Sequence, residues 1–437
     1  MSTADRVDER AGPAAQQALT SFQSGWALAL LTLVFCFNQV DRGIVAIVLD
    51  SIKAEMKLSD TTLGLMTGLG FAFVYFCAAF PLGRLADRTD RIKIISVGVM
   101  FYSVMAMFMG LAQNVFHLIT FRSLVAVGEA SGNAPSSAVI ADLYPHEKRP
   151  RATAIWSGGS YLGLFVGLTA GGWIHEHYGW RAALWGTAGP GMLVGLLLML
   201  TVRDPPRGAS EALPQKQAAT DLKATLNFLR SQRSYVLVVF AMLLSSFTAF
   251  SVQTWVPSFL VRVHHMDKGE IGFYAGLFKG LMGLLGVLAG GFLTQQIIKT
   301  RPHLIALVPI VASLLIPFAV AVFILAEEVN HTLVALAVAG FLIPAYQGAG
   351  MTMLVSVVPP AMRSFAITIM FAALALGGLG LGPLVVGMLS DYFTATAGAD
   401  SLRYALVFPG VLPFVTAFLF FCAARGLTGD QERISQN

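Results

Sequence analysis

Residues 83–93 read GRLADRTDRIK, a short polar stretch between two apolar ones at 60–83 and 93–113. Six of its eleven residues are charged, whereas each flank is long enough to cross a bilayer, which takes about 20 apolar residues. Two membrane-spanning helices joined by a charged turn account for this pattern. Outward from this turn, long apolar stretches and short polar turns alternate along the whole chain.

The composition agrees with many such spans. Of 437 residues, 56% are hydrophobic and 12% are charged, against about a quarter charged in soluble proteins. We expect an all-α integral membrane protein with twelve transmembrane helices in two six-helix bundles, because a β-barrel would show alternating segments of about ten residues. The predicted spans lie at 25–50, 60–83, 93–113, 115–142, 151–175, 181–202, 234–262, 270–298, 304–326, 332–357, 362–390 and 402–424.

Lysine and arginine are distributed unevenly between the two sides of these spans. Of 29 such residues, twenty lie on the side of the two termini, six lie on the other side and three lie within spans. The positive-inside rule therefore predicts a multi-pass protein of the cell (inner) membrane with both termini cytoplasmic. The same distribution explains the net charge of +5 without a nucleic-acid partner. We see no cleavable signal peptide before the first span.

A polar stretch divides the chain into two halves. Residues 203–217 carry three prolines and mixed charge, which is typical of an exposed linker. Short matches between the halves, such as Leu63-Gly64 with Ile271-Gly272, indicate parallel repeats with the substrate site between them. The predicted organisation is a cytoplasmic tail at 1–23, an N-terminal bundle at 24–202, a linker with a short amphipathic helix at 203–233, a C-terminal bundle at 234–425 and a cytoplasmic tail at 426–437.

Four charged residues lie inside predicted spans of the first half. Asp41 and Arg42 are in the first span, and Arg122 and Glu129 are in the fourth. A charge at this depth is costly unless it is paired or faces a water-filled path. At 1.5 Å per residue, Asp41 lies roughly 22 Å along its span and Arg122 about 10 Å below the outer face. In a core about 30 Å thick these are similar levels, and Glu129 lies two turns deeper than Arg122 on the same helical face.

We therefore predict that Asp41 and Glu129 bind protons and that Arg122 and Arg42 modulate this binding. An arginine beside a buried carboxylate favours its charged form, so a change of partner would couple protonation to conformation. The alternative is a static pair of salt bridges that holds the two spans together, although buried ion pairs are weak evidence for stability.

The charged turn offers a second cluster. Asp87 at a helix end and Arg91 one turn further are spaced for a charge-assisted pair. Asp142, at the cytoplasmic end of the fourth span, would complete an inner gate, and Gly83 would permit close helix contact. A solvated basic loop is the alternative.

The second half has one charge deep inside a span, Lys279. It lies too deep to reach the interface easily, so we expect it either to meet an anionic headgroup in the cavity or to pair with a polar neighbour. Residues predicted to line the same cavity are Tyr75, Asn133, Ser137, Trp156, Tyr161, Gln253, Thr254, Trp255, Gln347 and Thr352.

The turn at 83–93 resembles the signature loop of the major facilitator superfamily, with a glycine, a leucine, an Asp-Arg and a basic pair; it departs at Asp90, where the family usually has glycine. The stretches NQVDR at 38–42, VGEA at 127–130 and IADLYP at 140–145 resemble the spinster group. The superfamily resemblance covers all twelve spans, and the spinster resemblance is concentrated in spans 1, 2 and 4. It implies a transporter of a group linked to sphingolipid, sphingosine-phosphate and lysophospholipid export.

These observations lead to a hypothesis about function. We expect a monomeric secondary active transporter that uses protons to move a small amphipathic, anionic, lipid-like substrate by alternating access, surrounded by membrane lipids. A drug exporter or organic-anion symporter of the same fold and a passive lipid scramblase are the alternatives. The sequence has no Walker-type segment, no metal-ligand cluster and no Gly-x-Ser-x-Gly motif, so an ATP-driven pump and an enzyme are disfavoured. We predict neither a cofactor nor a metal.

Overall fold

The structure, a computed structural model, describes residues 21–208 and 222–435. Every regular element in these residues is helical. The first half comprises α1 (Ser21–Met56), α2 (Asp60–Thr67), α3 (Leu69–Arg88), α4 (Arg91–Met109), α5 (Val115–Ala130), α6 (Asn133–Leu143) and α7 (Arg149–Thr201). The second half comprises α8 (Leu222–Ser231), α9 (Arg233–His264), α10 (Lys268–Gly276), η1 (Leu277–Leu281), α11 (Met282–Thr300), η2 (Pro302–Leu304), α12 (Leu307–Leu325), α13 (Val329–Ala345), α14 (Gln347–Ser356), η3 (Pro360–Met362), α15 (Arg363–Ala373), η4 (Leu374–Gly380), α16 (Leu381–Ala397), η5 (Gly398–Asp400) and α17 (Ser401–Ser435).

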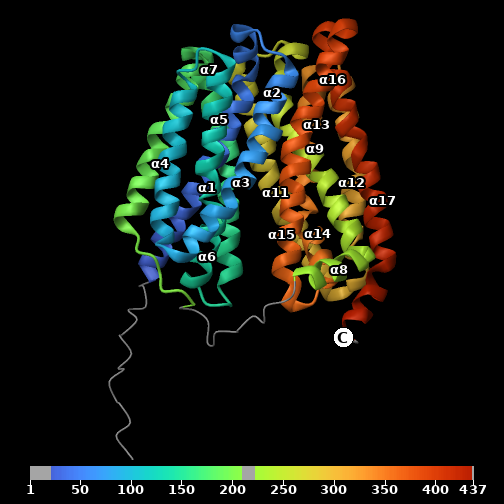
Figure 1. Cartoon of the computed structure of the whole chain (residues 1–437). Coiled ribbons are helices and arrows are strands. Elements are labelled where there is room, and N and C mark those ends of the chain that lie inside the picture. Colours follow the sequence, from blue (N-terminus) through green and yellow to red (C-terminus); the bar gives the residue numbers. More distant parts are fainter. Residues whose placement is uncertain (1–20, 209–221, 436–437) are drawn as a thin grey trace, which may run out of the picture.

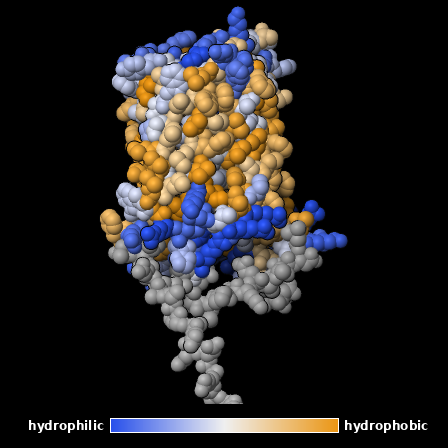
Figure 2. Space-filling model, turned by 60° about the vertical axis from the view of Figure 1, so that its left-hand side comes forward, coloured by the Kyte–Doolittle hydropathy of each residue, from blue (hydrophilic) through white to orange (hydrophobic). Residues whose placement is uncertain are grey.

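The helices form two groups that stand side by side, α1–α7 and α9–α17 (Figure 1). We call the end that carries α8 and the C-terminus the linker end, and the opposite end, where α1 gives way to α2, the far end. On the face that Figure 2 shows, an apolar band lies between two hydrophilic ends. This band fits a protein whose sides face lipid.

Nine helical stretches in the described residues are long and apolar enough to cross a membrane. One of them, 149–201, contains two spans that meet at Gly179, where φ is 83° and ψ is 169°. Another, 360–427, contains two spans that meet around η5. The pair α5 and α6, interrupted only at residues 131–132, supplies the remaining span. The predicted twelve-helix membrane fold is thus confirmed.

Glycines bring α7 directly onto α1. Gly159, Gly163, Gly167 and Gly171 follow one another at intervals of four, and so lie on one face of α7. A Cβ on Gly163 would lie 2.1 Å from the Cys36 carbonyl oxygen of α1, and the other three face α1 in the same way. Small residues allow such close approach between membrane helices. This contact fixes α1, which carries Asp41 and Arg42, against the rest of its half.

The predicted domain boundaries stay predictions. Most of the tail at 1–23, part of the linker at 203–233 and the end of the tail at 426–437 lie outside the described residues. Within the described linker, α8 buries Thr225 and Leu229 and exposes Lys223 and Arg230, so its two faces differ in polarity. It lies at the linker end, in front of the second half (Figure 1).

Candidate functional site

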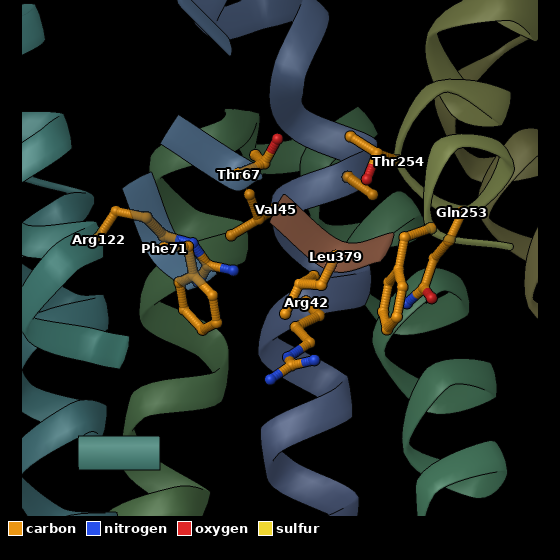
Figure 3. Close-up of a pocket in the computed structure, with 10 residues that line it drawn as sticks. Arg42, Val45, Thr67, Phe71, Arg122, Gln253, Thr254 and Leu379 are labelled. Atoms are coloured by element: carbon orange, nitrogen blue, oxygen red, sulfur yellow. The ribbon is translucent and has the colours of Figure 1, made fainter. Parts of the chain in front are cut away.

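A pocket lies between the two halves, near the middle of the spans. It holds about 370 Å³ of empty space, open solvent included. From the first half, α1, α2, α3 and α5 contribute Arg42, Val45, Ala46, Thr67, Phe71 and Arg122, and from the second half α9 and η4 contribute Phe250, Gln253, Thr254 and Leu379 (Figure 3). The pocket therefore has two guanidinium groups on one side and mostly apolar walls around them.

The first of these guanidinium groups holds a buried acid. Arg122 Nη1 donates to Asp41 Oδ2 at 2.5 Å, and the two side chains are only 3% and 4% exposed. The Arg122 guanidinium also lies over the Phe71 ring, 4.3 Å from its centroid. The helical depths predicted from the sequence placed Asp41 and Arg122 at one level, and they are direct partners here. Their role in proton binding stays a prediction.

In the second ion pair the arginine lies on α1 and the acid on α5, the opposite of the first pair. Arg42 on α1 donates to Glu129 on α5, with 3.1 Å from Nε and 2.7 Å from Nη2 to the same Oε2 atom. The Glu129 side chain is fully buried, while that of Arg42 is 16% exposed. Arg42 also lies over Phe71, at 5.2 Å. Both guanidinium groups thus contact the same aromatic ring, an attraction that helps to hold them in place.

The predicted cavity residues are spread more widely than expected. Of these candidates, Gln253 and Thr254 line the pocket. Asn133 instead donates to the Tyr75 hydroxyl at 3.0 Å. Trp156 stacks on Phe35, and Tyr161 faces Gly283. Ser137 and Gln347 are exposed, and Thr352 is half-buried.

Trp255 is a correction. Its side chain is completely buried, and its ring nitrogen donates to the Pro383 carbonyl within the second half. The prediction assigned it to the cavity as one of the polar and aromatic residues within the spans, beside Gln253 and Thr254. Successive residues of a helix point in directions about 100° apart, however, so these three cannot all face one side.

Lys279 is buried, and its ammonium group donates to two backbone carbonyls, those of Val252 at 2.8 Å and Gln253 at 2.9 Å. It lies in η1, a π-helical segment of five residues. Of the two interpretations left open by the sequence, pairing with a polar neighbour describes this conformation. Because Gln253 also lines the pocket, Lys279 supports the pocket wall from behind.

The cluster at the linker end differs from the prediction in its partners. Arg91 donates to Asp142 at 2.5 Å, as expected, and to Asp204 at 2.9 Å. Asp87 is exposed, and its carbonyl accepts a hydrogen bond from Arg207. The predicted Asp87–Arg91 pair is wrong because α3 ends at Arg88 and a new helix begins at Arg91, so one-turn spacing does not apply.

Gly83 is a second correction at this end. A Cβ on Gly83 would meet no atom within 4 Å, so no helix approaches it closely in this conformation. The glycine was interpreted as a contact point from its place in the signature loop. Close approach occurs instead at Gly98 and Gly128, where α4 and α5 cross.

An ion network at the far end was missed by the sequence analysis. Arg262 of α9 donates to Asp50 of α1 at 2.7 Å and to both oxygens of Asp60 of α2 at 2.7 and 2.8 Å. Lys53 also donates to Asp60, whose side chain is fully buried. The bonds of Arg262 join the two halves. The available signal was four charges of both signs at neighbouring span ends, but a count of charges on each side of the membrane treats such residues as solvated.

A second set of bonds joins the halves beside this network. Asp391 of α16 accepts hydrogen bonds from the backbone nitrogens of Asp60 and Thr61, at 2.9 and 2.7 Å, at the start of α2. Ser390 donates to Asp60 at 2.7 Å. A carboxylate at a helix N-terminus is stabilised by the free amide groups there. The far end is therefore closed by several charged contacts.

In the described residues, no group of three or more His, Cys, Asp or Glu is placed to hold a metal ion. The charges of the site instead form pairs around an opening between two helical bundles. A pocket of this kind, between two bundles of membrane-spanning helices, is typical of a membrane transporter.

Comparisons with known proteins agree. The family model described as Major Facilitator Superfamily matches residues 31–327, and the chain belongs to this superfamily, a family of transporters and not of enzymes. An MFS-type efflux pump of Mycolicibacterium smegmatis is 29% identical over 402 residues, covering 91% of this chain and 92% of that protein. Protein spinster homolog 1 of Xenopus laevis is 31% identical over 434 residues, covering 92% and 81%.

A solved structure is also similar. It is a crystal structure of a bacterial homologue of the human lysosomal transporter spinster, in an inward-facing and unoccupied conformation. It superposes with a TM-score of 0.85 at 26% identity, covering 94% of this chain and 99% of that one. The resemblance to spinster proteins predicted from the sequence is confirmed.

Proposed function

We propose that this secondary transporter is driven by protons and moves an amphipathic, anionic, lipid-like substrate across the cell (inner) membrane, as a monomer with both termini cytoplasmic. One observation carries the proposal. The two arginines that line the pocket are the same two that bind the buried carboxylates of Asp41 and Glu129. A substrate anion and a proton would therefore act on one set of charges.

Competition for the arginines would couple the two events. An anionic headgroup in the pocket attracts the Arg42 or Arg122 guanidinium away from its carboxylate. A buried carboxylate that loses its cationic partner binds a proton more readily, because an unpaired buried charge is costly. Substrate binding and proton binding then favour each other, and this coupling is reciprocal.

The pocket walls favour an amphipathic substrate. The guanidinium groups suit a phosphate or carboxylate head, while Phe71, Phe250 and Leu379 offer apolar surface for a hydrocarbon chain. The similarity to spinster proteins supports a lipid-like substrate. The similarity to an efflux pump favours a second candidate, export of amphipathic drugs.

Alternating access follows from the contacts at the two ends. The far end is closed by Arg262 with Asp50 and Asp60, while the Arg91–Asp142 cluster at the linker end stays within the first half and the start of the linker. We propose that this is the inward-facing state, that the Arg262 network breaks in the opposite state, and that Arg91 and Asp142 then contribute to the inner gate. The similarity to an inward-facing structure supports this assignment.

A transport assay separates the candidates. The full-length protein is reconstituted in vesicles and given labelled lysophosphatidylglycerol, sphingosine-1-phosphate or ethidium, with and without an imposed pH gradient. We expect the two anionic lipids to accumulate only with the gradient. Lipid flux that ignores the gradient would indicate a passive scramblase, and movement of ethidium alone would indicate a drug exporter; either result contradicts the proposal.

A further inference from the structure

A small chamber lies within the first half, beside Asp41. Its empty space is about 190 Å³, open solvent included, and it shares no lining residue with the pocket between the halves. Its walls come from α1, α4 and α7: Phe37, Asp41, Tyr102, Ser103, Ala106 and Ala188. Asp41 therefore lines this chamber, while its ion-pair partner Arg122 lines the central pocket.

Three oxygens of the chamber walls are buried and unpaired. They are Asp41 Oδ1, the Tyr102 hydroxyl and Ser103 Oγ. The three residues are only 2–3% exposed. A buried polar atom without a hydrogen bond costs about 1–3 kcal/mol, so three of them around one space call for a common partner. Phenylalanine and alanine would fill the same positions without that cost.

Glu129 approaches the same group of oxygens from α5. Gly128, its neighbour, lets α5 contact α4 at Tyr102, since a Cβ on Gly128 would lie 2.6 Å from the Tyr102 Cβ. Glu129 Oε1 is also buried and unpaired. The titratable groups that interact electrostatically with the Tyr102 hydroxyl are Glu129, Asp41 and Cys36. The Tyr102 hydroxyl thus lies near both acids, and no direct hydrogen bond joins it to either free oxygen.

We propose that the chamber binds a water molecule and that this water and the Tyr102 hydroxyl form a proton relay between Glu129 and Asp41. Asp41 Oδ1, the Tyr102 hydroxyl and Ser103 Oγ supply three hydrogen-bonding partners, the usual number for a buried water. Because the Tyr102 hydroxyl and Glu129 Oε1 have no direct hydrogen bond, the first step runs through a second water. In one transfer, this second water takes the Glu129 proton and gives one of its own to the Tyr102 oxygen, Tyr102 gives its proton to the chamber water, and the chamber water gives a proton to the Asp41 carboxylate. One proton moves, and Tyr102 and both waters end unchanged.

This arrangement separates two paths. The substrate meets Arg42 and Arg122 in the central pocket, while the proton passes behind the ion pairs within the first half. The inference rests on the proposed proton coupling and adds Tyr102 and Ser103 as the groups that conduct the proton. It predicts that the hydroxyl of Tyr102 matters and that its ring does not.

The bound water is tested without any substrate. Infrared difference spectra between pH 5 and pH 8 are recorded for the purified protein in lipid nanodiscs, in D₂O and in D₂¹⁸O. We expect a water O–D band that shifts with ¹⁸O in the wild type, is lost in Tyr102→Phe and is altered in Ser103→Ala. It should persist in Tyr235→Phe, a control that removes another buried tyrosine hydroxyl, one bonded to the Ala366 carbonyl. No ¹⁸O-sensitive band, or a band that Tyr102→Phe leaves unchanged, would overturn the site.

The relay is tested by transport in vesicles that contain a pH-sensitive dye, with lysophosphatidylglycerol as the probe. Tyr102→Phe should lower proton flux at least tenfold while equilibrium binding of the probe stays within twofold of wild type, and Ser103→Ala, which provides a second variant if the first folds poorly, should lower the flux less. If the wild type couples lipid transport to protons and both variants keep normal proton flux, the relay is refuted but the coupling is not. A wild type that moves the lipid without protons would refute the proposed coupling and the relay together.

Discussion

The two halves of the molecule accommodate buried charge in different ways. The first half encloses four charges as two ion pairs, Asp41 with Arg122 and Glu129 with Arg42. In the second half the buried Lys279 is held by backbone carbonyls. Carboxylates can take up a proton and release their partners, whereas carbonyls cannot. The comparison supports the proposal that protons bind in the first half.

The backbone differs as well. Leu277–Leu281 and Leu374–Gly380 of the second half are π-helical, and Leu379 of the latter lines the pocket. Such segments are rare and occur often at functional sites. Part of their hydrogen-bonding pattern differs from that of an α-helix, so they offer places where a helix can change shape. We therefore propose that the second half contributes the more adaptable wall of the pocket, and the first half its charged groups.

The largest effect is expected from breaking one ion pair on a single side. Arg122→Ala leaves the Asp41 carboxylate buried without its partner, which costs about 3–5 kcal/mol. Yield and thermal unfolding in detergent should fall sharply, and the double variant Asp41→Asn/Arg122→Ala should recover much of the loss. Equal losses in the single and double variants would show that Asp41 is not charged in the folded protein.

The next largest effect is expected at the far end. Arg262→Ala removes the bonds to Asp50 and Asp60, and each ~1.4 kcal/mol lost shifts the balance of states about tenfold. Spin labels at Lys57 and Tyr392, both exposed, should report a longer distance. Arg181→Ala is the matched control, because Arg181 binds Glu55 within the first half. If the distance between the labels is unchanged in Arg262→Ala, the Arg262 network does not hold the far end closed.

A smaller effect is expected from the second half. Lys279→Met removes a buried cation together with its desolvation cost, so thermal stability should stay equal or rise. Transport should slow moderately because Val252 and Gln253 lose their donor, while the number of protons moved per substrate stays the same. A changed proton-to-substrate ratio in vesicles would contradict the division of labour between the halves.

The smallest effect is expected from a charge pair near the surface of the first half. Glu55 accepts hydrogen bonds from Arg181 and Trp180, and its side chain is 47% exposed. Exposed pairs contribute about 0–1 kcal/mol. Glu55→Gln should leave the pH profile of transport unaltered and the melting curve nearly so. A shifted pH profile would mean that proton coupling is not restricted to the buried pairs.

The pairing of Asp41 with Arg122 was accessible from the sequence because helix geometry converts residue number into depth, whereas the pairing of Arg42 with Glu129 was not, because the same depths placed Glu129 two turns lower. Charges in apolar spans are conspicuous, and Asp41 and Arg122 fell at one level by rise per residue alone. The network of Arg262 was not accessible in this way. Its members sit at span ends, where a charge is ordinarily solvated, and only the packing of α2 against α9 and α16 buries Asp60.

Other features depend on details that no periodicity encodes. The Asp87–Arg91 pair failed because a helix ends between the two residues, where Asp90 accepts a hydrogen bond from the Lys93 nitrogen and begins the next helix. Tyr102 looks in the sequence like an ordinary residue of an apolar span, and its place near Glu129 follows from the close crossing of α4 and α5 at Gly128. The π-helical segments leave no distinct pattern in the sequence.

The central claim, that the first half binds the proton, is tested most directly by the ratio of protons to substrate. Lysophosphatidylglycerol uptake and proton uptake are measured together in vesicles for the wild type, Glu129→Gln and Lys279→Met. We predict coupled uptake in the wild type and in Lys279→Met, and lipid movement without protons, or none at all, in Glu129→Gln. An unchanged ratio in Glu129→Gln, or a ratio lost in Lys279→Met, would contradict the claim.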